Sequence, residues 1–251
     1  MTEPDLKLEQ LKQKLSQVRR SAWQPIVREG NDALTVSKFA GKPWLSANEQ
    51  WPVCPNCNKS MRLILQLNLN EVPESLKGKF GNGLLQLFYC TNYESNCEDK
   101  CSGWESFSEI HLVRIVLPES LSREVQLPEI ENLSSANLIV DWEEKEDYPD
   151  CYSGTEDTNL MHGIIFNNDE CDFLLNEDAL YVTGTKLAGW PTWIQNHQYP
   201  NCPTCNQPMN QFVFQLDPED NHPCTWGDWG KGYLLQCSNH KEQLAFLWQC
   251  S

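Results

Sequence analysis

The chain has 251 residues and carries 19 Lys and Arg against 35 Asp and Glu, which gives a formal net charge of −16. This acidity argues against direct binding of nucleic acid, whose phosphates are bound by Lys and Arg, and is compatible with a basic protein partner. The longest apolar runs are only a few residues, so no membrane-spanning helix is expected. The sequence MTEPDLKLEQ at the start lacks the features of a secretory signal, which predicts a cytoplasmic protein.

The first predicted element is an N-terminal amphipathic helix over residues 5–20. Leu8, Leu11 and Leu15 recur in it at helical spacing. This apolar stripe favours a helix that packs against the rest of the protein. Binding of a partner through the same stripe is the alternative.

Two segments of the chain resemble each other at a fixed offset of 148 residues. The sequence CPNC at 54–57 matches CPTC at 202–205, and the Ala-Gly pair at 40–41 matches the pair at 188–189. Several matches at one offset rarely arise by chance, so the pattern predicts an internal duplication.

The duplicated units are predicted at about 35–117 and 183–251, joined by an acidic linker region at 118–182. This region contains the charged run 141–147, which indicates a solvated face or, alternatively, a docking surface for a basic partner. The two units are expected to pack pseudo-symmetrically within a single domain, residues 1–251.

Each unit is expected to consist mostly of strands, which makes the fold class mainly β (α+β). Short apolar runs bounded by Gly, Pro and Asn are typical of strands. The predicted strands lie at 63–65, 84–89 and 111–117 in the first unit and at 212–214, 233–235 and 244–248 in the second.

The second unit contains a complete set of metal ligands. Cys202 and Cys205 are separated by two residues, and so are Cys237 and His240. In a chain expected to be reduced, such pairs indicate a metal site rather than disulfides. Two cysteine-rich loops of this kind are zinc-ribbon-like knuckles. Four protein ligands suit tetrahedral zinc and leave no position open for water, so the ion would be structural.

The first unit offers one cysteine more than such a site needs. Cys54, Cys57 and Cys90 correspond to the three cysteines of the second unit, and either Cys97 or Cys101 supplies the fourth ligand. Cys97 is the predicted one, because it lies nearer the position equivalent to the histidine. An iron–sulfur cluster would use similar ligands, but the repeated spacing favours two structural zinc ions. The predicted ligands are Cys54, Cys57, Cys90, Cys97, Cys202, Cys205, Cys237 and His240.

The remaining cysteines and the histidines do not form a recognisable catalytic motif. The sequences HExxH and GxSxG and the phosphate-binding GxxxxGK[ST] loop are absent from the chain. The cysteines outside the two predicted sites are expected to be small buried hydrophobic residues. They are Cys151, Cys171, Cys224 and Cys250.

Several motifs resemble those of the YwqG-like family, a bacterial domain of unknown function. They are the sequences GKPWL at 41–45, GLLQLFY at 83–89, WGD at 226–228 and FLWQC at 246–250. The resemblance covers roughly residues 30–251 and implies a β-rich fold with an internal duplication. Many YwqG-like proteins lack the paired cysteines, so the family does not imply the metal sites. The repeated pattern is also similar to the eukaryotic programmed-cell-death-protein-2 family, which is implicated in escorting a newly made ribosomal protein.

These observations predict a cytoplasmic, zinc-binding protein that acts as a protein-binding or chaperone-like module for a basic client. The resemblance implies escort as the role, and the acidic charge suits it because ribosomal proteins are basic. Family members also occur near bacterial toxin genes, which implies an immunity-type inhibitor of a toxin as an alternative. A second alternative is an enzyme or small-ligand binder that uses a cleft between the two units.

Overall fold

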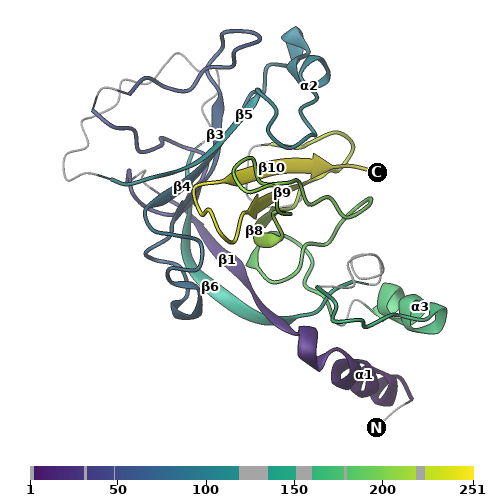
Figure 1. Ribbon diagram of the computed structural model, residues 1–251. Coiled ribbons are helices and arrows are strands. Elements are labelled where there is room, and N and C mark those ends of the chain that lie inside the picture. The colour runs from purple at the N-terminus through teal and green to yellow at the C-terminus, as the bar shows by residue number, and fades with distance from the viewer. Residues whose placement is uncertain are drawn as a thin grey trace.

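The computed structural model describes residues 3–30, 33–47, 49–118, 135–150, 160–177, 180–218 and 224–251. The strands are β1 (Arg20–Glu29), β2 (Lys38–Phe39), β3 (Arg62–Asn68), β4 (Leu84–Tyr89), β5 (His111–Val116), β6 (Asn137–Asp147), β7 (Lys186–Ala188), β8 (Gln211–Leu216), β9 (Lys231–Gln236) and β10 (Leu244–Gln249). Within the described residues they form one antiparallel sheet, in the order β10-β9-β8-β7-β1-β6-β2-β3-β4-β5. The edge strands β10 and β5 contact each other, so the sheet is nearly closed like a barrel (Figure 1). The protein is therefore mainly β, as predicted.

Few helices accompany this sheet. The α-helices are α1 (Glu3–Lys14), α2 (Cys97–Lys100) and α3 (Asn168–Glu177), and the 3-10 helices are η1 (Ser16–Val18), η2 (Glu74–Leu76) and η3 (Tyr93–Ser95). Helix α1 and helix α3 lie at one end of the molecule and α2 at the other (Figure 1). None of the helices in the described segments is long and apolar enough to cross a membrane.

The N-terminal helix is real but ends earlier than predicted. Helix α1 stops at Lys14, and the chain is already in strand β1 from Arg20, where it pairs with β6. The apolar stripe faces inward, because Leu11 and Leu15 are buried against Tyr148 and Trp190. The interpretation as a packing helix is therefore confirmed for these residues.

All six predicted strands are present, as parts of β3, β4, β5, β8, β9 and β10. Their apolar side chains build the main core, which continues from one half of the sheet to the other. At its centre the rings of Phe39 on β2 and Phe214 on β8 lie 6.2 Å apart. Both side chains are fully buried, and burial of each stabilises the fold by roughly 1.5–3 kcal/mol.

The segment predicted as an acidic linker contains structure of its own, so that expectation is corrected. The run 141–147 belongs to β6, a central strand that pairs along its whole length with β1. Helix α3 also falls inside the predicted linker. The run is nevertheless largely solvated, because Asp141, Glu143, Glu144 and Glu146 are exposed. Pairing with a neighbouring strand stabilises β6 although its composition is poor for a strand.

The long strands β1 and β6 connect the two halves of the sheet. Strand β1 pairs with β7, which continues into β8, β9 and β10, and β6 pairs with β2, which continues into β3, β4 and β5. Each long strand thus lies beside a short strand from the other half of the sequence. Strands β1 and β6 pair with each other at the centre of the sheet. The two units that the sequence predicts therefore belong to one continuous sheet.

Candidate metal centres

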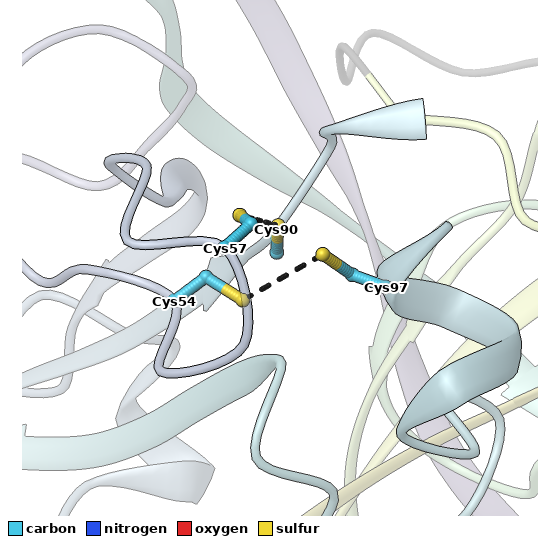
Figure 2. A group of neighbouring side chains, drawn as sticks. All are labelled: Cys54, Cys57, Cys90 and Cys97. Atoms are coloured by element: carbon cyan, nitrogen blue, oxygen red, sulfur yellow. Dashed lines mark hydrogen bonds between the residues drawn. The ribbon is translucent and has the colours of Figure 1, made fainter. Parts of the chain in front are cut away.

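The four predicted ligands of the first unit come together beside α2. Cys54 and Cys57 lie on the turn before β3, Cys90 directly follows β4, and Cys97 begins α2. Their sulfurs point toward one another (Figure 2) and lie within 4.8 Å of each other. The Sγ atoms of Cys54 and Cys97 are 3.9 Å apart, and those of Cys57 and Cys90 are 3.7 Å apart. We call this group site 1.

The four predicted ligands of the second unit form an equivalent group, site 2. Cys202 and Cys205 lie on the turn before β8, and Cys237 and His240 lie on the turn between β9 and β10. The Sγ atoms of Cys205 and Cys237 are 3.6 Å apart. His240 directs Nδ1 into the group, at 3.7 Å from the Cys237 sulfur and 4.0 Å from the Cys202 sulfur.

The spacing of these donor atoms fits a single tetrahedral ion. A zinc–sulfur bond is about 2.3 Å long, so two sulfurs on one tetrahedral zinc lie about 3.8 Å apart. The five sulfur–sulfur and sulfur–nitrogen distances given above for the two sites, 3.6–4.0 Å, are close to this value. A disulfide would need about 2.05 Å. A multi-iron cluster would hold the sulfurs further apart, because its own iron and sulfide atoms lie between them. Both sites can therefore hold one metal ion each.

The first cysteine pair of each site sits on the same kind of backbone turn. The N–H of Asn58 donates to the carbonyl of Cys54, and the N–H of Asn206 donates to the carbonyl of Cys202, both at 2.8 Å. Both asparagines have positive φ, at 55° and 56°. Asparagine tolerates this left-handed conformation better than most residues, so it suits the position that closes the turn.

Local hydrogen bonds stabilise one thiolate in each site, whereas desolvation raises the pKa of Cys90, Cys97 and Cys237. Desolvation raises the pKa of Cys202, but the backbone N–H groups of Cys205 and Thr204 and the neighbouring thiols outweigh it and bring the pKa from 9.0 to about 6. Desolvation also raises the pKa of Cys57, but hydrogen bonds from the Asn92 side chain and other groups outweigh it and bring the pKa from 9.0 to about 7. Deprotonated sulfur is the form that binds metal.

The structure also separates the two candidates for the fourth ligand of site 1. Cys97 belongs to the group, whereas Cys101, one helical turn later, does not. The Nδ2 of Asn56 donates to the Cys97 sulfur at 3.2 Å, a contact that the sequence analysis did not anticipate. Of the cysteines expected to be buried, Cys224 is buried, whereas Cys171 and Cys250 are half-buried; Cys151 lies outside the described residues.

Each site lies where its half of the sheet meets the other half. Beside site 1, Tyr89 donates to Glu98 at 2.9 Å and accepts a hydrogen bond from Trp248 of β10 at 3.1 Å. Beside site 2, Gln236 donates to the carbonyl of Phe80, in the loop between β3 and β4, at 3.0 Å. An ion in either site would therefore fix a loop that closes the sheet.

A buried histidine near site 1 predicts acid sensitivity. His111 begins β5, stacks on Tyr89 at 6.4 Å and donates through Nε2 to the carbonyl of Glu105 at 3.1 Å. Desolvation lowers its pKa from 6.5 to about 4, against a weaker opposite effect of that carbonyl. As the pH falls below 6.5, the unfolded chain binds a proton that the folded protein does not bind until about pH 4. The stability contributed by neutral His111 is present above pH 6.5 and is lost over this window.

We therefore expect the free energy of unfolding to fall by about 2 kcal/mol on account of His111 between about pH 7.5 and about pH 5. Urea denaturation of the wild type and of His111→Phe over this pH range checks the prediction. The variant should show a shallower pH dependence, since it has no group that titrates at this position. Identical pH dependences for the two proteins would contradict the prediction.

Comparison with known proteins agrees with part of the sequence analysis. Residues 37–247 match a family model described as "Domain of unknown function (DUF1963)", the family of the YwqG-like domains. A stretch of 44 residues is 48% identical to "Uncharacterized protein YpfL" of Salmonella typhimurium strain LT2. That stretch is 18% of this chain and 10% of YpfL, so the chain spans only a small part of that relative. Because the family model covers most of the described sheet, the chain belongs to the DUF1963 family.

Proposed function

We propose that the protein is a cytoplasmic binding module for basic proteins, built on two structural zinc ions. The observation that carries the zinc assignment is the pair of four-donor groups with near-tetrahedral spacing. Site 1 would use Cys54, Cys57, Cys90 and Cys97, and site 2 would use Cys202, Cys205, Cys237 and His240. All four positions of each ion would be filled by protein atoms, so the ions would hold loops in place rather than activate water. A reducing compartment such as the cytoplasm would keep the thiols available.

We also propose that the two halves are copies of one unit, each with a zinc knuckle. Equivalent local geometry supports this proposal. At the offset of 148 residues, Ala40 and Ala188 have φ of 57° and 58°, and Gly41 and Gly189 have φ of 73° and 81°. The strand order is symmetric about the β1–β6 pair, with β2 to β5 on one side and β7 to β10 on the other.

Charge supports the choice of a basic client. The net charge is −16, and the long central strand β6 exposes several carboxylates. Acidic surfaces attract basic partners over distances comparable with the Debye length, so association should weaken as salt is added. Escort of a newly made basic protein, which the programmed-cell-death-protein-2 resemblance implies, would use the same attraction.

A titration of the zinc-loaded protein with a synthetic peptide tests this function. The probe is a fluorescein-labelled peptide in which Lys and Arg alternate with Ser, and the matched control replaces every Lys and Arg by Glu. We expect a rise in fluorescence anisotropy with the basic peptide at low salt, a smaller rise at several-fold higher salt, and none with the acidic peptide. Failure of the basic peptide to bind at low salt would contradict the proposed function.

A further inference from the structure

The loop that follows β4 contains an exposed set of aromatic side chains. Tyr93, Trp104 and Phe107 are 71%, 38% and 46% exposed. They lie on residues 93–109, which we call the aromatic loop. Trp104 is also anchored to the sheet, because its ring meets that of Trp248 at 6.2 Å. Large apolar side chains gathered on one exposed segment are typical of an interaction site.

The fold does not require this loop at its observed length. In the half that contains site 1, 21 residues separate β4 from β5. In the other half, 7 residues separate β9 from β10 at the equivalent place, and they still supply two ligands to site 2. The shorter connection contains no Phe, Trp or Tyr. Neither the sheet nor the metal site therefore requires the exposed rings.

The aromatic loop is held in a defined conformation. The hydroxyl of Ser108 donates to the carbonyl of Cys101 at 2.7 Å, and the N–H of Gly103 donates to the carbonyl of Glu98 at 2.8 Å. Phe107 has a φ of 65°, a left-handed conformation that a bulky residue rarely adopts. Its ring is presented to solvent although the backbone at this position would favour Asn or Gly. A pre-ordered loop loses little entropy when it binds.

The charge around these rings identifies the kind of partner. Glu94, Glu105 and Glu109 are exposed on the aromatic loop, and Lys100 is its single basic residue. Among the residues that the structure describes, no salt bridge involves these three carboxylates. On β6, by contrast, Glu143 pairs with Lys145 and Glu146 with Arg19.

We propose that the aromatic loop is the docking surface for a Lys- and Arg-rich segment of the client. Aromatic faces attract ammonium and guanidinium groups, and neighbouring carboxylates add charge-assisted hydrogen bonds. The proposal rests on the proposed function, since it locates the surface that binds the basic client. It also gives the loop between β4 and β5 a role that the metal site alone does not explain.

The test measures the affinity of the same basic peptide for single variants of the full zinc-loaded chain. Phe107→Asn removes a ring while it keeps a residue that tolerates positive φ, so stability and zinc content should be retained. We expect it to weaken binding about two- to fivefold. The variant Glu105→Gln with Glu109→Gln should weaken binding and flatten its salt dependence.

Two matched controls separate this surface from the rest of the protein. Ile165→Asn removes an apolar side chain that is 67% exposed and precedes α3 by three residues, and α3 lies at the opposite end of the molecule from α2 (Figure 1). Glu143→Gln with Glu144→Gln removes two exposed carboxylates from β6. Ile165→Asn should bind the peptide like the wild type, and the β6 variant, which loses only long-range attraction, should be weakened less than Glu105→Gln with Glu109→Gln. If Phe107→Asn loses one zinc ion, Tyr93→Ser replaces it as the ring variant and should show the same weakening.

The outcomes distinguish failure of the surface from failure of the function. If the wild type binds and the loop variants bind equally well, the aromatic loop is not the docking surface. If in addition the β6 variant loses affinity, the basic client binds at β6 instead. If the wild type itself does not bind the basic peptide, the proposed function fails and the docking proposal fails with it.

Discussion

Replacement of Cys97 by serine is expected to remove one of two bound zinc ions and to lower the free energy of unfolding by several kcal/mol. The reason is its place in site 1, where its sulfur lies 3.9 Å from that of Cys54 and accepts a hydrogen bond from Asn56. A structural zinc ion contributes about 10–16 kcal/mol of binding free energy in small zinc peptides, and a part of such a contribution would be lost here. Zinc content by native mass spectrometry and urea denaturation check both expectations.

The matched control is Cys101→Ser, at the residue directly after the same short helix. Cys101 is half-buried, is one helical turn from Cys97 and lies outside the group of donors. We expect this variant to keep two zinc ions and to change the free energy of unfolding by less than about 1 kcal/mol. The reverse pattern, with zinc lost on replacement of Cys101 and kept on replacement of Cys97, would contradict the ligand assignment.

The variant Lys186→Met is expected to destabilise the protein by about 3–5 kcal/mol. Lys186 on β7 and Asp147 on β6 form a salt bridge of 3.0 Å in which both side chains are fully buried. Asp147 also accepts hydrogen bonds from the N–H groups of Val182 and Trp190, both at 2.7 Å. Desolvation lowers the pKa of Lys186, and the carboxylate of Asp147 opposes that change. Without the lysine, a buried carboxylate would remain without a counter-charge.

The exposed salt bridge between Arg19 and Glu146 provides the comparison for this pair. Its N–O distance is 2.7 Å, but its side chains are 57% and 54% exposed, so Arg19→Met should change the free energy of unfolding by about 1 kcal/mol or less. Adding Asp147→Asn to Lys186→Met should recover part of the lost stability, because a neutral amide can still accept from the two N–H groups. Equal effects of Lys186→Met and Arg19→Met in urea denaturation would refute the expectation.

Much of the candidate sites could be predicted because the information is local. Each pair of ligands lies within one short turn, so the spacing of Cys202 and Cys205, or of Cys237 and His240, is visible without knowledge of the fold. The choice between Cys97 and Cys101 is not local in this way. It depends on how α2 is oriented against the turn that carries Cys54.

The centre of the sheet could not be predicted because its strands depend on their partners. Strand β1 contains Pro25, which lacks an N–H group and is rarely found within a central strand. The proline is tolerated beside an irregularity in the β1–β6 pairing, between Ile26 and Val27. Strand β6 carries a run of charged residues that resembles a linker in composition. Apolar periodicity identifies neither strand, since their stability comes from pairing across the sheet.

The short strands β2 and β7 were missed for a different reason. Each is no longer than three residues, which is too short for a periodic apolar pattern to be recognised. They are nevertheless the positions at which the central pair of strands joins the two halves of the sheet. The repeated Ala-Gly pair gave a signal, because it marks a turn with positive φ in both halves: it directly follows β2, and its alanine is the last residue of β7.

The metal content of the untagged protein tests the central claim most directly. Elemental analysis combined with native mass spectrometry gives both the identity of the metal and the number of ions per chain. The structure places two groups of four donors at single-ion spacing, so the expected result is two zinc ions per chain. If the purified protein contained iron in these sites, or no metal although its thiols had been kept reduced, the assignment of two structural zinc ions would be contradicted.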